Sequence, residues 1–148
     1  MSSGYLLDTS VLSLLAPGRP SSVGTLAKWI GDHSDALYIS AVTIAEIEQG
    51  ICKLHRSGGT ERAGALARWL DILIDNGGER IMAFDARTGR IAGGLSDRAV
   101  AAGRHPGFAD IAIGATAVAH DLLLLTRNGK HFAPLGIAFR NPVDNLPA

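Results

Sequence analysis

Short apolar runs alternate along this chain with longer segments in which apolar residues recur at helical spacing. The short runs predict strands at residues 5–7, 37–39, 81–84, 122–125 and 137–139. Four of them are apolar throughout, as is typical of strands that are buried on both faces of a parallel sheet. The alternation therefore predicts an α/β fold in which strand–helix–strand units build a mainly parallel five-stranded sheet, with helices on both sides.

Two amphipathic helices are predicted between the second and third strands. The first begins at Ser40, a candidate N-cap, and ends at Gly58 and Gly59; its apolar stripe is Ile44, Ile47, Ile51 and Leu54. The second ends at Asn76-Gly77-Gly78, and its stripe follows i, i+3, i+4, i+7, i+8 spacing through Leu66, Trp69, Leu70, Leu73 and Ile74. We expect the two to form a helical hairpin.

Two further helices are expected later in the chain. Asp85 is a candidate cap for a helix that continues through Ala102, and residues 109–120 form a helix rich in small side chains. Residues 17–22 and 104–107 are the expected loops. Trp29 and Trp69 lie on helical stripes and are expected in the core. We find no repeat, linker or low-complexity tract, so residues 1–148 are interpreted as a single domain.

Composition excludes several classes of protein. Hydrophobic residues make up 47% of the 148 residues and charged residues 19%, which does not fit intrinsic disorder. No run approaches the roughly 18 apolar residues of a membrane span, and the first residues lack the features of a signal peptide. A cytoplasmic protein without a membrane partner is therefore expected. The single Cys52 excludes an intramolecular disulfide framework and a multi-cysteine zinc site.

The balanced net charge conceals a basic middle segment. Residues 51–104 carry nine basic and six acidic side chains, and 11 of the 14 cations in the chain are arginines. Arginine has the planar fork that suits phosphate, which favours an anionic partner. Six side chains are candidates for phosphate contact: Arg56, Arg62, Arg87, Arg90, Arg98 and Arg104. The alternative is that these arginines only solvate and cap helices.

Acidic residues follow the first two predicted strands. In an open α/β sheet, ligands bind beyond the carboxyl ends of the strands. Asp8 directly follows the first strand, where it either caps a helix or points into a crevice. Glu46 lies in the second turn of the helix after the second strand, on a flank of the apolar stripe, and Glu48 lies nearer the stripe edge. Helical angle alone does not choose between these two glutamates, and both also fit a solvated helix face.

A third acid and a polar segment follow later. Asp110 occupies the first turn of an otherwise apolar helix, where the helix dipole alone would favour a carboxylate. The fourth predicted strand ends in Thr126-Arg127-Asn128, and Asn128-Gly129 also fits a simple turn. Taken alone, each of these signals is compatible with an ordinary structural role.

The four segments together resemble one family. Leu-Leu-Asp-Thr-Ser from Leu6, Ser-Ala-Val-Thr-Ile-Ala-Glu-Ile from Ser40, Ala-Asp-Ile-Ala-Ile-Gly-Ala-Thr-Ala from Ala109 and Leu-Leu-Thr-Arg-Asn from Leu124 are similar to the PIN-domain ribonucleases. The likeness is strongest to the VapC and FitB-like toxins of bacterial toxin-antitoxin pairs and spans residues 5–142. It implies a PIN-like three-layer α/β/α fold.

The resemblance also implies a site. Asp8, Glu46 and Asp110 match the family's acids that hold Mg²⁺ or Mn²⁺, which favours Glu46 over Glu48. Asn128 is carried over as a further catalytic residue; the residues expected to position the substrate are Thr9, Thr126, Arg127 and His131. His131 stands where many members have a fourth Asp, which puts a second metal ion in doubt.

The implied function is that of an endoribonuclease toxin. Hard carboxylate oxygens suit Mg²⁺ or Mn²⁺, and a bound dication activates water and stabilises negative oxygens during phosphodiester hydrolysis. The expected partners are an RNA substrate, a cognate antitoxin and a second copy in a homodimer. The alternative is a catalytically impaired PIN-like module that binds RNA or protein. A phosphoryl-accepting receiver domain usually has adjacent acids after its first strand, and a dinucleotide-binding domain needs a glycine-rich turn there; Asp8-Thr9-Ser10 matches neither.

Overall fold

The five predicted strands form one parallel sheet in the computed structural model, which describes residues 4–18 and 24–148. The strands are β1 (Gly4–Leu7), β2 (Leu37–Ser40), β3 (Ile81–Met82), β4 (Leu122–Leu125) and β5 (Phe139–Arg140). They are arranged in the order β3-β2-β1-β4-β5, and every neighbouring pair is parallel. The chain therefore starts at the central strand, builds one half of the sheet and then the other, so the strand order changes direction between β1 and β4.

Helices connect the strands, and short 3₁₀ turns extend several of them. The α-helices of the described residues are α1 (Thr9–Leu12), α2 (Gly24–Asp32), α3 (Ala41–Arg56), α4 (Thr60–Gly77), α5 (Ala86–Ala101), α6 (Phe108–Ala119) and α7 (Gly129–Phe132). None of these helices is long and apolar enough to span a membrane.

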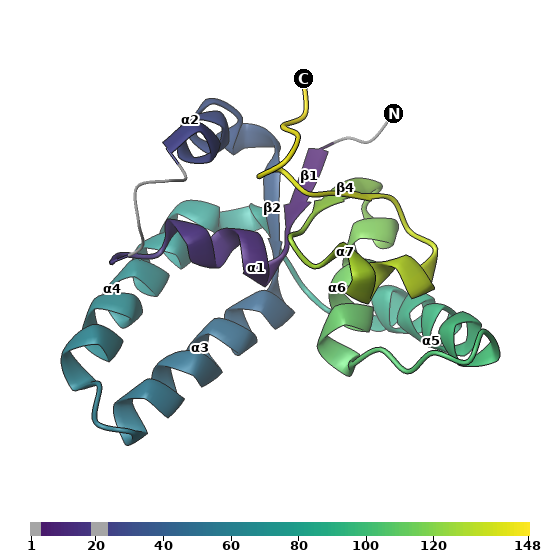
Figure 1. Ribbon diagram of the computed structural model, residues 1–148, viewed down its shortest axis with the longest axis horizontal. Coiled ribbons are helices and arrows are strands. Elements are labelled where there is room, and N and C mark those ends of the chain that lie inside the picture. Colours follow the sequence, from purple (N-terminus) through teal and green to yellow (C-terminus); the bar gives the residue numbers. More distant parts are fainter. Residues whose placement is uncertain (1–3, 19–23) are drawn as a thin grey trace.

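The sheet separates two apolar clusters, which confirms the three-layer α/β/α architecture (Figure 1). Leu6 and Leu124 belong to the cluster that includes residues of α5 and α6. The next residue of each strand, Leu7 and Leu125, belongs to the cluster that includes residues of α3 and α4. Side chains alternate between the faces of a strand, so a strand covered on both faces needs apolar residues at every position.

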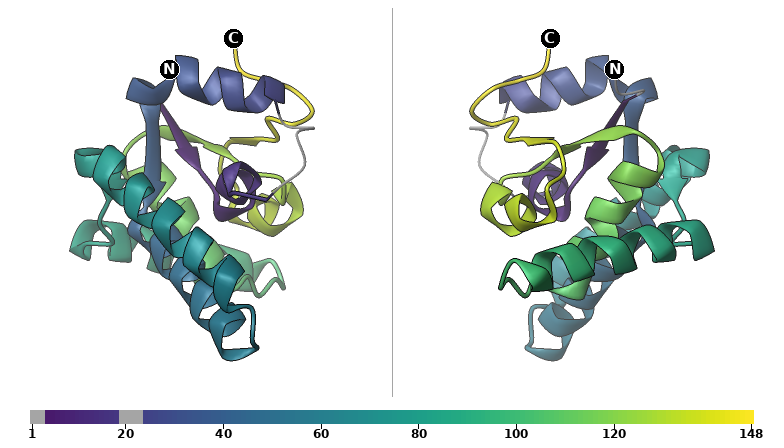
Figure 2. Two further views of the ribbon diagram at one scale, coloured as in Figure 1. Left: turned by 90° about the vertical axis from the view of Figure 1, so that its left-hand side faces the viewer. Right: turned by 90° about the vertical axis from the view of Figure 1, so that its right-hand side faces the viewer.

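The predicted helical hairpin is confirmed. Helices α3 and α4 pack side by side and extend away from the sheet (Figures 1 and 2). Ser40 caps α3, with its hydroxyl oxygen accepting from the Val42 N–H at 3.0 Å. Asp85 caps α5 in the same way, accepting from the Thr88 N–H at 2.9 Å. The late loop at residues 104–107 is also present.

Several predicted boundaries were wrong. Strand β3 ends at Met82, because Phe84 packs against the core without pairing to β2. Strand β5 begins at Phe139, two residues later than predicted, since Ile137 supplies core packing while its backbone stays outside the sheet. Helix α2 was not predicted as an element. Of the early loop expected at 17–22, residues 19–22 lie outside the described residues.

The two tryptophans differ in burial. Trp29 of α2 is only 8% exposed, and its indole N–H donates to the Pro147 carbonyl at 3.1 Å. This contact joins α2 to the C-terminal segment, and both lie at the end of the molecule opposite the hairpin tip (Figure 2). Trp69 of α4 is half-buried at the edge of the α3–α4 cluster. The core prediction is therefore confirmed fully for Trp29 and only partly for Trp69.

Candidate active site

A pocket of about 380 Å³ opens at the carboxyl end of the sheet, where β1, β2 and β4 end. We call it the site pocket. The position agrees with the general rule that ligands bind where the strand order of an open α/β sheet changes direction. Its lining residues come from α1 and the turn after it, α3, α6 and the segment after β4: Asp8, Thr9, Ser10, Ser13, Glu46, Asp110, Asn128 and His131. The three acids singled out from the sequence thus share one pocket.

Asp8 is held in place by hydrogen bonds. It is only 4% exposed, and its Oδ1 accepts from the Thr9 N–H at 2.8 Å as the N-cap of α1. Its Oδ2 accepts from the Ser10 hydroxyl at 2.8 Å and from the Thr126 hydroxyl at 2.7 Å. The backbone N–H of Asp8 donates to the Leu125 carbonyl at 2.9 Å, which ties it to the end of β4. Asp8 is therefore both a helix cap and a wall of the site pocket.

Glu46 is oriented by a threonine from another element. The Thr9 hydroxyl donates to Glu46 Oε1 at 2.6 Å, and Thr9 Oγ1 also lies 3.1 Å from the hydroxyl oxygen of Thr43. Thr43 is fully buried one helical turn before Glu46 on α3, so both face α1. Glu48 is exposed and does not line the site pocket. The packing of α3 against α1 therefore places Glu46, and not Glu48, at the pocket.

Asp110 reaches the site pocket from the first turn of α6. Its carboxylate approaches His131 of α7, whose Nδ1 lies 3.4 Å from Asp110 Oδ2. Burial raises the pKa of the Asp110 carboxyl; His131 opposes this shift, while the negative charge of Asp8 adds to it. The upward direction therefore comes mainly from the partial removal of this carboxyl from water.

The segment after β4 completes the wall around Asp8. Thr126 is fully buried, and its hydroxyl oxygen also accepts from the Asn128 N–H at 2.9 Å. The Ser10 hydroxyl oxygen accepts from the Arg127 N–H at 3.1 Å. Thr126 thus supports Asp8 from beneath the pocket, whereas the exposed Arg127 lines an adjoining hollow.

Sequence reasoning missed two residues of this wall. Ser10 and Ser13 line the site pocket, and Ser10 bonds to both Asp8 and the segment after β4. A serine two residues after a capping Asp is a common local partner, so its contact with Asp8 was predictable. Its contact with Arg127 was not, because the two residues are distant in sequence.

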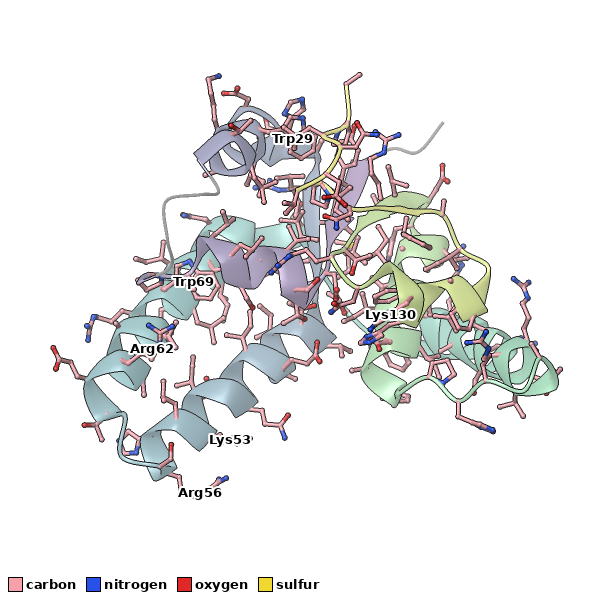
Figure 3. The ribbon with its side chains drawn as sticks, viewed as in Figure 1. Trp29, Lys53, Arg56, Arg62, Trp69 and Lys130 are labelled. Atoms are coloured by element: carbon pink, nitrogen blue, oxygen red, sulfur yellow. The ribbon has the colours of Figure 1, made fainter. Side chains whose placement is uncertain are left out.

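Arg104, one of the six arginines singled out from the sequence, lies beside the site pocket. Arg104 lines a neighbouring hollow that shares Asp110 and His131 with it. Arg87 and Arg98 instead donate to the backbone carbonyls of Ala119 and Leu135, at 2.6 and 3.2 Å, and so tie α5 to neighbouring segments. Arg56 and Arg62 lie on the hairpin, far from Lys130 of α7 (Figure 3).

The donor set of the site pocket fits a hard divalent cation, although the described residues contain no ready-made cluster of three or more His, Cys, Asp or Glu side chains. Carboxylate oxygens are the ligands that Mg²⁺ and Mn²⁺ prefer. Burial raises the pKa of the Asp110 carboxyl, and a bound cation would favour its charged form. Mg²⁺ usually binds through one or two carboxylates and keeps several waters, so a tight chelate is not needed.

Comparison with known proteins shows the family of this chain. The model of the PIN domain family matches residues 5–136, and the chain belongs to this family. The VapC ribonuclease Y4jK of Sinorhizobium fredii is 31% identical over 93% of this chain and 96% of its own length. The toxin FitB of Neisseria gonorrhoeae is 30% identical over the same shares. A chain in the crystal structure of FitAcB from Neisseria gonorrhoeae superposes with a TM-score of 0.80 at 28% identity, covering 93% of this chain and 97% of that chain.

Proposed function

We propose that this protein is a metal-dependent endoribonuclease that hydrolyses RNA phosphodiester bonds in the cytoplasm as the toxin of a toxin-antitoxin pair. The observation that carries the proposal is the convergence of Asp8, Glu46 and Asp110 on one pocket at the carboxyl ends of parallel strands. Membership of the PIN domain family and similarity to a VapC ribonuclease support the same activity.

In this proposal Asp8, Glu46 and Asp110 hold Mg²⁺ or Mn²⁺. The bound cation supplies a more acidic water and positive charge beside the oxygens that become negative during hydrolysis. Ser10 and Thr126 fix the orientation of Asp8, and Thr9 fixes Glu46, so the carboxylates need little rearrangement on binding. Asn128 and His131 line the same pocket, which supports a contact of both side chains with the bound RNA.

The proposed partners are an RNA substrate, a cognate antitoxin and a second copy of the chain. The antitoxin is supported by the structural relatives, which include FitAcB and FitAB bound to an IR36 DNA fragment, both at 28% identity. The homodimer follows from the family resemblance. Size-exclusion chromatography with light scattering tests it directly: a single species near twice 15.5 kDa supports it, and a monomer at micromolar concentration contradicts it.

An RNA cleavage assay tests the activity. We expect cleavage in Mg²⁺ or Mn²⁺, none in EDTA, and a loss of more than about 100-fold in Asp8→Asn, because the variant removes the charge of one proposed metal ligand. Asn keeps the size and one acceptor oxygen of Asp8, so the cap of α1 is preserved.

The matched control is Glu48→Gln. It removes the same charge from an exposed position two residues from Glu46 and should leave cleavage unchanged. RNA binding that is independent of metal, without cleavage under any of these conditions, would instead support the binding-module alternative.

A further inference from the structure

Three hollows lie along the carboxyl edge of the sheet, with the site pocket between the other two. The site pocket shares Asp110 and His131 with a hollow of about 360 Å³, which we call the basic pocket, on the side of α6 and α7. It shares Ser10, Ser13 and Asn128 with a hollow of about 450 Å³, which we call the polar pocket, on the side of α1. A strand longer than one nucleotide therefore has room on both sides of the acids.

The charges of the three hollows differ. The site pocket contains the three acids. The polar pocket carries one cation and one acid, Arg127 and Asp144. The basic pocket is lined by Arg104 and Lys130 together with His105 and His131, and its one carboxylate is Asp110, at the edge it shares with the site pocket. The basic pocket is thus the hollow with an excess of positive charge.

The cations of the basic pocket are available to a ligand. Within residues 4–18 and 24–148, neither Arg104 nor Lys130 takes part in a salt bridge, and both are exposed. This distinguishes Arg104 from Arg87 and Arg98, whose guanidinium groups are occupied by backbone carbonyls. Lys130 extends from α7 close to α6 (Figure 3).

Cations beside the acids would help the site pocket to bind RNA. Each nucleotide brings a negative phosphate, and a phosphate next to the scissile one would lie close to the carboxylates of the site pocket. Paired cations just beyond those carboxylates offset this repulsion, and phosphate contacts fix the register of a nucleic acid strand.

We propose that the basic pocket binds the phosphate adjacent to the scissile one, with Arg104 and Lys130 as its ligands. This inference rests on the proposed ribonuclease function and adds a direction: the RNA strand leaves the acids on the side of α6 and α7. Arg104 and Lys130 are then substrate-positioning residues, and they act on binding without taking part in the chemistry.

The test compares two double variants in steady-state cleavage of a single-stranded RNA oligonucleotide in Mg²⁺. Arg104→Ala/Lys130→Ala removes both cations of the basic pocket. The control, Arg68→Ala/Lys53→Ala, removes the same two residue types from exposed positions on the hairpin. We expect KM to rise roughly tenfold in the first variant with kcat within about twofold of wild type, since a phosphate contact made equally in substrate and transition state affects only binding. The control should match wild type.

Two further readouts separate a phosphate contact from a structural effect. The slope of log affinity against log salt should become shallower by about 1.4, from two contacts at about 0.7 each on a single strand. The second readout uses an oligonucleotide in which the phosphate beside the cleaved bond is replaced by a neutral methylphosphonate. Wild type should have a higher KM for this substrate than for the unmodified one, whereas the KM of Arg104→Ala/Lys130→Ala should be the same for both. Equal KM and equal salt slopes for the two double variants, or a loss confined to kcat, would overturn the proposal.

Failure of the ribonuclease function has a different signature. In that case wild type does not cleave, and fluorescence anisotropy with the same oligonucleotide decides the fate of the basic pocket. A selective loss of affinity and of salt dependence in Arg104→Ala/Lys130→Ala supports it as a phosphate site, and identical binding by the two double variants rejects it.

Discussion

The two walls of the site pocket are built differently. The first wall, formed by Asp8, Thr9, Ser10 and Glu46, is cross-linked by hydrogen bonds between α1, α3 and the end of β4. The second wall consists of Asp110 and His131, whose contact from Oδ2 to Nδ1 is 3.4 Å long and whose side chains are 28% and 47% exposed. One wall is therefore a rigid frame, and the other is open to solvent and to ligands.

Because of this difference, substitutions of Asp8 and Asp110 should have different effects on stability. Asp8 stabilises the fold as the N-cap of α1 and as the acceptor for two hydroxyls, and it also lines the site pocket. The two roles considered from the sequence, helix cap and crevice residue, are therefore both present. Asp110 makes few contacts of this kind and is desolvated near another carboxylate. Removing either acid should impair metal binding, but only removal of Asp8 should also weaken the fold.

The largest expected effect is the difference in stability between Asp8→Ala and Asp110→Ala. In Asp8→Ala the cap of α1 is lost and the buried Thr126 hydroxyl loses its acceptor, which should cost about 2 to 4 kcal/mol of unfolding free energy. Asp110→Ala should change it by no more than about 1 kcal/mol, since the favourable helix dipole and the desolvation of its carboxylate oppose each other. Urea denaturation in EDTA measures both.

Equal losses in the two alanine variants would show that the walls are equally rigid. Asp8→Asn serves as the control for shape, because it retains an acceptor at the cap. It should recover most of the stability lost in Asp8→Ala.

Thr126→Val should weaken the first wall by removing a hydrogen bond to Asp8. The change keeps the side-chain volume but removes the hydroxyl that bonds to Asp8 and Asn128, so we expect a loss of about 1 to 2 kcal/mol in stability. Cleavage should fall by about 10- to 100-fold, as for other residues that orient metal ligands.

The matched control for this change is Thr116→Val. Thr116 is equally buried, and its hydroxyl donates to Ala112 within α6, away from the site pocket. Its cleavage rate should stay near wild type. If both variants lose activity in parallel with stability, Thr126 has no orienting role.

The free energy of unfolding, measured in EDTA as a function of pH, tests the environment of Asp110 in the second wall. The pKa of Asp110 is raised above 3.8 in the folded protein, so its ionised form destabilises the fold, and this penalty disappears as the pH falls through the folded-state pKa toward 3.8. Wild type should therefore gain stability relative to Asp110→Asn as the pH is lowered. A difference that is constant with pH, or that changes in the opposite direction, would contradict the shift.

His131→Ala should have the smallest effect. The side chain is about half exposed and its contact with Asp110 is long, so solvent screens the interaction. We expect cleavage to fall by less than about fivefold. A pH-rate profile of the variant checks this, and a loss of two orders of magnitude or of one limb of the profile would assign His131 a catalytic role.

Part of the fold was predictable from local sequence patterns. The uninterrupted apolar runs indicated strands buried on both faces, and Ser40 and Asp85 indicated where α3 and α5 begin. The late start of β5 was not predictable, because Ile137 is as apolar as a strand residue and only the pairing of β4 with Phe139 sets the boundary.

The functional residues likewise fall into those that local patterns indicated and those that depend on long-range contacts. Local sequence patterns were enough to indicate that acids follow the first two strands and lie in the first turn of α6, because capping and apolar periodicity act over a few residues. The family resemblance already favoured Glu46 over Glu48, and the structure adds that Glu46 lines the same pocket as Asp8. Two contacts became visible only in the folded chain: Ser10 bonds across to Arg127, and Arg87 and Arg98 bind carbonyls, whereas Arg104 makes no salt bridge within the described residues. These outcomes depend on which helices pack together around the sheet, and the contacts that fix them join residues distant in sequence.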